Sequence, residues 1–301
     1  MIIADKLQNK FYRERDKYLG SLCLKKIMNE ELQYGITERS FKGSHSRKEQ
    51  YIISMASYAG RYHVLPIALK SLLLQTVKPD RIVVWLDEEN RENAVTEELQ
   101  KLCVYGVEYR YTTDGLKPHK KYLYAMQEFP NANIVTVDDD VVYSGDMLES
   151  LVKAHALYPQ CICARRVHKI TFDQTGKIKP YREWKYEYRK AKAPSHMLCA
   201  TGGGGTLYPA NIMPEETFNM NAIRELSLNA DDIWLKLMEL IGGVKVMWVK
   251  NRYVMPLEID NSQYSSLCRG NVDKGGNDSF LKLLFERYPQ AFRVLEESAG
   301  L

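Results

Sequence analysis

The stretch that decides the fold is NIVTVDDD at residues 133–140, in which an apolar run ends in three aspartates. The run at 133–137 is rich in β-branched residues and predicts a short buried strand. Two carboxylates in contact at a partly buried strand end repel by about 4 kcal/mol at an effective dielectric of 20. A raised pKa or a bound cation relieves such repulsion.

Carboxylate oxygens at the end of a strand suit Mg²⁺ or Mn²⁺, which proteins usually share with a phosphate. The three aspartates, Asp138, Asp139 and Asp140, therefore indicate a nucleotide-diphosphate substrate. The alternative is a solvated acidic turn. The apolar residues that follow directly, 141–143, disfavour that alternative.

Strands and helices alternate on the amino-terminal side of this stretch. The strands are expected at 51–56, 81–86 and 107–111, and the helices at 65–73, 92–102 and 119–129. This alternation predicts an α/β fold with a mostly parallel, doubly wound sheet flanked by helices. Ligands of such sheets bind outside the carboxyl ends of the strands, where Asp87 and the three aspartates are placed.

The rest of the chain is expected to pack on this domain. Residues 1–49 predict an N-terminal helical extension, 50–260 the main domain, and 261–301 a C-terminal helical segment on the same domain. A helix is expected at 146–158 and a strand at 161–167. Aromatic and basic residues are interleaved at 180–189, which indicates either an amphipathic cover over the core or a lid or acceptor surface.

The composition is that of an ordinary globular protein. The 301 residues are 45% hydrophobic and 27% charged, with a net charge of +4, which does not indicate a nucleic-acid partner. A slightly basic surface favours phosphorylated substrates or weak association with a membrane surface. No apolar stretch approaches the ~20 residues needed to cross a bilayer, and residues 1–6 lack the pattern of a secretory signal. Six scattered cysteines are interpreted as reduced core residues, which predicts a cytoplasmic location.

Two further motifs are candidates for ligand contact. Four glycines at 202–205 permit close backbone approach, but the lysine of a phosphate-binding P-loop does not follow them. They predict the floor of a pocket, with a flexible loop as the alternative. Lys120 and Lys121 begin a helix, where the helix dipole disfavours cations. A binding role and a solvated basic helix start both remain open for them.

The residues Asn229 to Leu235 predict the start of another helix, with Asn229 as its N-cap. Asp231 and Asp232 would then lie in the first turn, where the helix dipole stabilises carboxylates. A carboxylate fixed there could also act as a general base. The residues alone leave both interpretations open.

The order of these motifs resembles the GT-A glycosyltransferases, especially bacterial enzymes related to family 2. The resemblance covers roughly residues 50–255. The aspartates at 138–140 are similar to the family's DxD motif, and QTVKPDRIVV at 75–84 resembles its QT-x-x-P-x-x-I-V-V segment. Asp231-Asp232 is similar to the ED motif, with aspartate in place of the usual glutamate.

The resemblance implies a role for each matching position. Asp140 and Asp138 would hold Mn²⁺ or Mg²⁺, and Asp232 or Asp231 would be the catalytic base. The donor-binding residues would be Ser54, Ala56, Ser57, Asp87, Lys120, Asp138, Asp139, Gly203 and Gly204.

The resemblance also implies the reaction. A sugar would move, with inversion, from a nucleotide-sugar donor such as a UDP-sugar to a glycan or lipid-linked glycan. This reaction would serve surface polysaccharide synthesis in the cytoplasm or at the inner face of the cell membrane. Sugar transfer passes through an oxocarbenium-like state, in which a cation neutralises the leaving diphosphate.

Two rival functions remain. The aspartates at 138–140 also fit the motif of haloacid-dehalogenase-type phosphatases, although that family places its nucleophile on the first strand. A non-catalytic module that binds nucleotide sugars or glycans is the other rival. It is disfavoured because every expected acidic position is filled.

Overall fold

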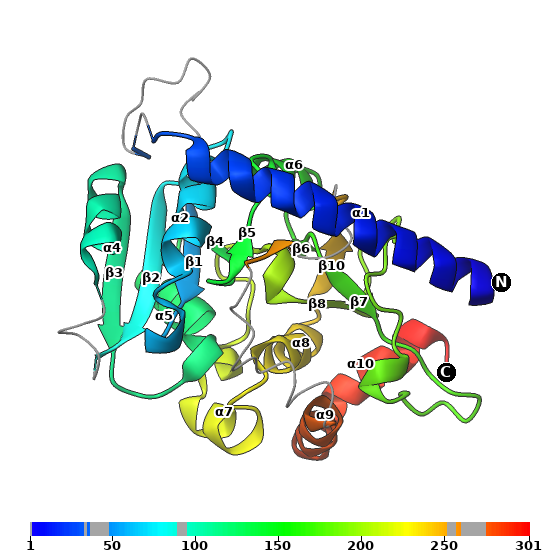
Figure 1. Ribbon diagram of the computed structural model, residues 1–301. Coiled ribbons are helices and arrows are strands. Elements are labelled where there is room, and N and C mark those ends of the chain that lie inside the picture. The colour runs from blue at the N-terminus through cyan, green and yellow to red at the C-terminus, as the bar shows by residue number, and fades with distance from the viewer. Residues whose placement is uncertain (1, 33–34, 37–47, 89–94, 252–256, 260–274) are drawn as a thin grey trace.

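A computed structural model describes residues 2–32, 35–36, 48–88, 95–251, 257–259 and 275–301. Its centre is a seven-stranded sheet with the order β10-β6-β9-β4-β1-β2-β3 (Figure 1). The strands are β1 (Tyr51–Ala56), β2 (Arg81–Asp87), β3 (Val107–Thr112), β4 (Asn133–Thr136), β6 (Cys161–Ala164), β9 (Thr206–Tyr208) and β10 (Lys245–Trp248). Strand β9 is antiparallel to both of its neighbours, and the other pairings in this sheet are parallel. The prediction of a mostly parallel sheet is confirmed.

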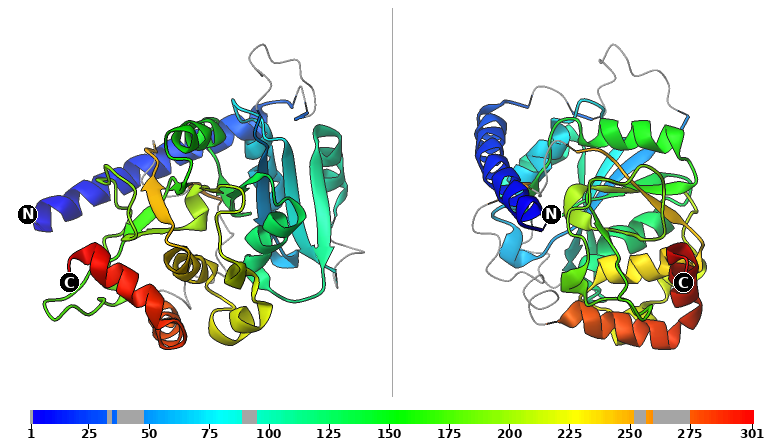
Figure 2. Two further views of the ribbon diagram at one scale, coloured as in Figure 1. Left: turned by 180° about the vertical axis from the view of Figure 1, so that it is seen from behind. Right: turned by 90° about the vertical axis from the view of Figure 1, so that its right-hand side faces the viewer.

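Helices cover both faces of this sheet, because successive side chains of a strand point to opposite sides. Met55 and Val84 pack on one side with α2 (Leu65–Leu73), α4 (Glu97–Leu102) and α6 (Met147–Leu157). Val83 and Trp85 pack on the other side against α5 (Lys120–Glu128). The helix α8 (Asp231–Ile241) covers β6 and β10 on the side of α5. Figure 2 shows this layered arrangement from two further directions.

Most of the predicted elements are present, with shifted boundaries. The helix expected at 92–102 begins at Glu97, where Thr96 caps it by accepting a hydrogen bond from the Leu99 amide; residues 92–94 lie outside the described residues. The strand expected at 161–167 is divided into β6 and β7 (Val167–Lys169). Strand β7 pairs with β8 (Leu198–Ala200) in a separate two-stranded ribbon.

Within its described residues, the amino-terminal extension contains one long helix, α1 (Ile2–Asn29), in keeping with the helical extension that was predicted. Its Leu24 and Ile27 pack against Val64 and Ala68 beside α2, and against Leu257. Leu257 belongs to β11 (Leu257–Glu258), which is antiparallel to β5 (Val141–Val142). The extension therefore rests on α2 and on the β5–β11 pair, of which β5 directly follows the acidic stretch.

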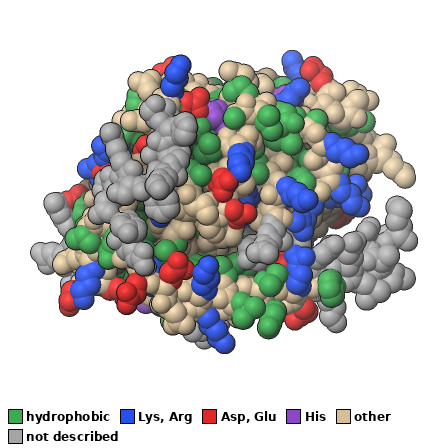
Figure 3. Space-filling view, turned by 90° about the horizontal axis from the view of Figure 1, so that it is seen from above, with side chains coloured by type: hydrophobic (Ala, Val, Ile, Leu, Met, Phe, Trp, Pro, Cys, Tyr) green, Lys and Arg blue, Asp and Glu red, His purple; other side chains and the backbone are tan. Residues whose placement is uncertain are grey.

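The C-terminal helices α9 (Gly276–Arg287) and α10 (Pro289–Ala299) pack on α8, and α7 (Met220–Leu226) packs on α9. The first part of the segment expected at 261–301, up to residue 274, lies outside the described residues. In the portion of the chain that the structure covers, no helix has the length and apolar character required to cross a bilayer. Acidic and basic side chains are interspersed on the face shown in Figure 3, in keeping with the net charge of +4.

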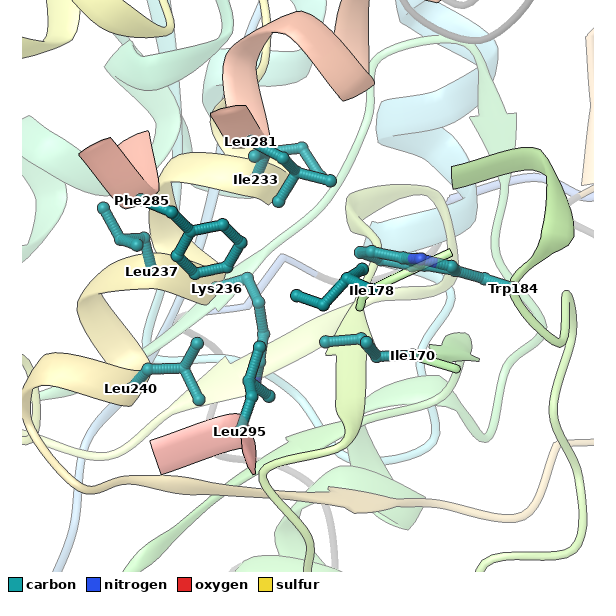
Figure 4. A pocket seen from close by; sticks show the side chains of 10 residues that line it. All are labelled: Ile170, Ile178, Trp184, Ile233, Lys236, Leu237, Leu240, Leu281, Phe285 and Leu295. Atoms are coloured by element: carbon teal, nitrogen blue, oxygen red, sulfur yellow. The ribbon is translucent and has the colours of Figure 1, made fainter. Parts of the chain in front are cut away.

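The aromatic and basic segment at 180–189 covers the core, as one of its two interpretations predicts. Tyr181 and Trp184 are 5% and 4% exposed. Trp184 lines a cavity of about 10 Å³ between the residues that follow β7 and helices α8 to α10 (Figure 4). The aliphatic stem of Lys236 lies among the apolar side chains of this cavity, and its ammonium pairs with Glu239. The cavity is therefore part of the hydrophobic core.

Candidate functional site

The three aspartates after β4 are held by three different partners. Asp138 accepts a hydrogen bond from the Lys121 ammonium at 2.8 Å. Asp139 accepts hydrogen bonds from the Ser57 hydroxyl at 2.6 Å and from Arg61 at 2.7 Å. Asp140 forms an ion pair with the same Arg61 nitrogen at 2.8 Å. Asp139 and Asp140 are thus buried and all three carboxylates are paired with cations, so the solvated-turn alternative is wrong.

Burial and mutual repulsion shift the pKa values of the carboxyl groups in this cluster. Burial and the charge of Asp138 raise the pKa of Asp140 to about 7, against the opposing effect of Arg61. Burial also raises the pKa of Asp139, again opposed by Arg61. Burial would lower the pKa of Arg61, but the carboxylates of Asp139 and Asp140 outweigh it and raise that pKa. Arg61 therefore stays charged and supplies the counter-charge of the cluster.

Lys121 joins the acidic stretch to α8. Its ammonium lies 2.8 Å from an Asp138 oxygen and 2.8 Å from an Asp231 oxygen. Burial would lower the pKa of Lys121, but the two carboxylates outweigh it and raise that pKa well above its ordinary value. The neighbouring Lys120 pairs with Asp87 at the end of β2, at 2.6 Å. Both lysines are buried, so the alternative of a solvated basic helix start is wrong.

Asp231 and Asp232 are adjacent in sequence but differ in their surroundings. Lys121 outweighs the effect of burial on Asp231 and lowers the pKa of that carboxyl. Burial and the charge of Asp231 raise the pKa of Asp232 to about 8, opposed by Lys121. Asp232 accepts one hydrogen bond, from the Gly202 amide at 3.1 Å. The structure therefore gives opposite pKa shifts to two carboxyl groups that the sequence alone could not distinguish.

The predicted N-cap of α8 is wrong by one residue. The helix begins at Asp231, and its N-cap is Ala230, which has no side chain able to cap it. The Asn229 side chain instead accepts a hydrogen bond from the Lys117 ammonium at 2.8 Å. The residue that precedes the N-cap of α8 is therefore tied to the segment that precedes α5.

The glycine run is packed against protein groups of the site. Gly202–Gly204 form a buried 3₁₀ turn. A Cβ atom on Gly202 would lie 2.7 Å from the Lys121 ammonium nitrogen. A Cβ atom on Gly204 would lie 2.4 Å from the Cβ atom of Arg166 and 2.8 Å from its backbone nitrogen. These glycines allow the turn to approach the Lys121 cluster; the predicted contact of Gly203 and Gly204 with the donor stays a prediction.

The expected ligand contacts at the end of β1 stay predictions, and two of the three side chains are buried. Ser54 is fully buried, where its hydroxyl donates to the Lys121 carbonyl at 2.5 Å and accepts from the Trp85 indole at 2.9 Å. Ser57 is 3% exposed and is bound to Asp139. These two side chains are occupied in positioning other residues of the site, and Ser54 has no surface for a nucleotide. Ala56, at the last position of β1, is partly exposed.

Several residues of the site were not predicted from the sequence. Arg61 follows β1 in a short 3₁₀ turn, and Arg166 follows β6. Arg166 pairs with Glu187 at 2.7 Å and donates to the Thr201 hydroxyl at 3.0 Å. Glu187 comes from the segment at 180–189, so that segment also reaches the site. A basic residue just after a strand end was the available signal for Arg166, whereas Arg61 lies further along the chain, in the turn that follows β1.

A fourth carboxylate reaches the acidic cluster from the far end of the chain. Glu258 lies opposite Val141 in the pairing of β11 with β5, and the Ile259 amide donates to the Asp140 carbonyl at 2.8 Å. Burial raises the pKa of Glu258, opposed by Arg166 and Arg61, and the charge of Asp138 adds to the rise. This two-residue strand has no distinctive sequence pattern.

The chemistry of these groups fits a divalent cation that is shared with a diphosphate. Within the described ranges, no three His, Cys, Asp or Glu side chains converge closely enough to hold a metal ion by themselves. Asp138 and Asp140 supply two hard oxygen donors whose repulsion a cation would relieve. The buried Nε of Arg61 has no hydrogen-bond partner among the described residues, so it could bind a phosphate oxygen.

Comparisons with known proteins were made with the sequence and with the fold. The family model described as Glycosyl transferase family 2 matches residues 53–208. No curated protein matches the chain. Among solved structures, S. aureus TarS 1–349 in complex with UDP is 14% identical with a TM-score of 0.43. The match covers 66% of this chain and 57% of the TarS chain, so this chain spans less than two thirds of that structure.

A second solved structure is the mannosyltransferase PcManGT from Pyrobaculum calidifontis in complex with GDP-Man and Mn²⁺. It is 12% identical, with a TM-score of 0.47, and the match covers 95% of this chain and 83% of that one. The family model spans more than half of the sequence and includes the last four residues of β1, the acidic stretch and the glycine run. The match of this family model shows that the chain belongs to glycosyl transferase family 2.

Proposed function

We propose that this protein transfers a sugar, with inversion, from a nucleoside-diphosphate donor to a hydroxyl of a glycan or lipid-linked glycan. Asp138 and Asp140 hold Mn²⁺ or Mg²⁺, and Asp232 is the catalytic base. The observation that carries the proposal is the contrast at the start of α8. Lys121 keeps Asp231 ionised, whereas burial and Asp231 leave Asp232 with a pKa of about 8.

The donor side of the site is formed by the ends of β1, β2 and β4. Asp87, paired with Lys120 and partly exposed, is the group proposed to contact the nucleoside. Arg61, with its unpartnered Nε, would hold a diphosphate oxygen. The cation, when bound, supplies Lewis-acid stabilisation of the charge that develops on the leaving diphosphate. We assign no direct donor contact to Ser54 and Ser57, which hold Lys121 and Asp139 in place.

The acceptor side is formed by the first turn of α8 and the glycine run. The acceptor hydroxyl loses its proton to Asp232 as its oxygen forms a bond to the anomeric carbon. The bond from that carbon to the diphosphate breaks, and the diphosphate leaves with the electron pair. Attack from the face opposite the leaving group gives inversion. A base with a pKa of about 8 is matched to proton transfer near neutral pH.

The proposal includes a cellular setting. A nucleotide-sugar donor and an acceptor for surface polysaccharide would meet in the cytoplasm or at the inner face of the cell membrane. Cys161, Cys163 and Cys199 are free thiols, which is compatible with a reducing compartment. Membership of a glycosyltransferase family replaces the phosphatase alternative. A non-catalytic binding module is an outcome that the next experiment can detect.

The test begins with UDP- and GDP-sugars screened by thermal shift with and without Mn²⁺. For the donor that stabilises the protein, Asp232→Asn should lower the transfer rate by roughly 10²–10⁴-fold, because general-base catalysis contributes that much. Calorimetry should show unchanged donor affinity.

Asp140→Asn is the complementary variant and should lose Mn²⁺-dependent donor binding. Full transfer activity in Asp232→Asn would contradict the assigned base. Donor binding without transfer or hydrolysis in the unmodified protein, with every acceptor tried, would support the non-catalytic module.

A further inference from the structure

A second hollow lies outside the site described above. It has a volume of about 490 Å³ and is formed by the segment that follows β7 and by the end of α10. Figures 1 and 2 show this segment beside the C-terminal end of α10. The apolar part of its lining includes Ile170, Phe172 and Met197. This hollow is here named the lysine groove, because Lys169, Lys179 and Lys185 also line it.

The three lysines are placed close together with little compensating charge. Lys169 and Lys185 are directly opposite each other in an antiparallel bridge, with both backbone hydrogen bonds at 2.9 Å. Like charges in that arrangement are destabilising. Lys179 pairs with the half-exposed Glu183 at 3.8 Å. Among the described residues, no carboxylate lies within 4.0 Å of the Lys169 or Lys185 ammonium.

The ribbon of β7 and β8 connects the lysine groove to the proposed catalytic site. Lys169 is the last residue of β7, and Arg166 directly precedes its first residue. Three residues of strand span about 10 Å. The Arg166 side chain bonds to Thr201, which is the N-cap of the glycine turn that donates to Asp232. An extended chain of sugars that enters the site beside Asp232 could therefore continue along this ribbon to the groove.

We propose that the lysine groove binds an anionic stretch of the acceptor, a glycan chain that carries carboxylate or phosphate groups. The ammonium groups of Lys169 and Lys185 neutralise its charges. The apolar faces of its sugar rings lie on Phe172, which is partly exposed. This inference rests on the proposed function for the identity of the chain as an acceptor, but binding in the groove needs neither donor nor cation.

The test uses binding without catalysis. Labelled oligogalacturonate is the carboxylate probe, a phosphorylated dextran oligomer is the phosphate probe, and a neutral maltooligosaccharide of matched length is the control. We expect the unmodified protein to bind an anionic probe, more weakly as salt increases. The double variant Lys169→Glu/Lys185→Glu should bind at least roughly tenfold more weakly, a loss of about 1.4 kcal/mol.

The matched control is Lys25→Glu/Lys282→Glu, which makes the same change in net charge at exposed positions on α1 and α9. It should keep the affinity of the unmodified protein. Equal loss in both double variants, or equal binding of the neutral probe, would overturn the proposal. Binding to phosphatidylglycerol vesicles with no binding to either anionic probe would also overturn it, in favour of a membrane surface. The variant Asp232→Asn should bind the probes normally, so failure of the proposed base and failure of the groove are distinguishable.

Discussion

Two buried lysines form ion pairs with α8 residues: Lys121 contacts this helix from α5, and Lys236 belongs to it. They differ in where their partners lie along the chain. Lys121 binds Asp138 after β4 and Asp231 on α8, so its partners come from two other parts of the chain. Lys236 binds Glu239, three residues further along the same helix. The ion pairs of Lys121 reach the surface at Asp138, whose side chain is 32% exposed. Lys236 and Glu239 are only 2% and 1% exposed.

The difference distinguishes the candidate site from an ion pair that is buried within the core. Lys121 holds three segments together through its ion pairs with Asp138 and Asp231, two carboxylates of the proposed site. Lys236 and Glu239 satisfy each other locally, inside an apolar cluster that includes Leu240 and Leu295. A buried ion pair is by itself weak evidence for stability or for function. Burial alone does not distinguish these two lysines. The separation of their partners along the chain does, because only Lys121 joins residues from distant segments.

The largest effect is expected from Lys121→Met. Removing one partner of a buried ion pair leaves uncompensated charge, here on Asp138 and Asp231, and costs about 3–5 kcal/mol. The free energy of unfolding, measured with urea, should fall by that amount, and transfer should be lost. Lys101→Met is the control, because Lys101 pairs with Glu97 on an exposed helix face. A Lys121 variant with unchanged stability would show that the cluster is held together by other contacts.

The next effect is the response of the Lys121 region to acid. Burial lowers the pKa of His119 to about 4, and its ring contacts the Tyr122 hydroxyl and the Ser227 carbonyl. The unfolded chain takes up a proton near pH 6.5, while the folded protein does so only near pH 4. Stability should therefore be complete above pH 6.5 and fall by ~3 kcal/mol as the pH decreases to 4.

The measurement for His119 is urea unfolding at several pH values. His119→Gln should flatten the loss between pH 6.5 and 4, relative to the unmodified protein. The exposed His63 serves as the control, and His63→Gln should leave the profile unchanged. His168, whose pKa is also lowered by burial, contributes to the acid sensitivity that remains. A profile for His119→Gln that matches the unmodified protein would contradict the assignment.

Two glycines of the turn beside Lys121 give a smaller and more selective effect. Gly204→Ala places a Cβ atom against the backbone of Arg166, which cannot move easily, and should cost about 1–3 kcal/mol. Gly202→Ala meets only side-chain ends, the Lys121 ammonium and the Asp138 carboxylate. Its stability should change less, while transfer should fall because Lys121 is displaced. Thermal unfolding and initial rates measure both, and the reverse order of stability would contradict this packing.

The smallest loss of stability and activity is expected from replacing the Lys236–Glu239 pair. The double variant Lys236→Met/Glu239→Leu replaces a buried pair with apolar groups of similar size, a change that is often neutral or stabilising. Stability and transfer should both be retained. The single variant Lys236→Met leaves Glu239 without its cation and should be less stable than the double variant. Loss of transfer in a folded double variant would show that Lys236 serves the site, and the comparison of the two lysines would fail.

The backbone of the domain could be predicted because its signals are local. The β-branched run before Asp138 and the apolar run at 51–56 form neighbouring parallel strands, as the alternation of elements requires. The acidic stretch was placed at a strand end for the same reason. Its role as a motif needed the resemblance to a family, since a strand end alone does not specify a donor.

The pairings within the site could not be predicted because they join residues that are distant in sequence. Arg61 is 78 residues from Asp139, and Ser54 is 67 residues from the Lys121 carbonyl that it binds. Side-chain periodicity shows which face of an element is apolar, but it does not show which cation meets which carboxylate. The contrast between Asp231 and Asp232 depends on such a meeting, so it required the structure.

The guanidinium of Arg61 is shared between Asp139 and Asp140, and this has a consequence for the ligand-free protein. The resting acidic cluster is already partly neutralised by a residue of its own chain. If Asp140 binds the cation as we propose, an incoming ion must compete with Arg61 for that carboxylate, and an ion alone gains little. A nucleotide that arrives with the ion would give Arg61 a new anion to hold. The proposed function therefore favours the binding of metal and nucleotide together.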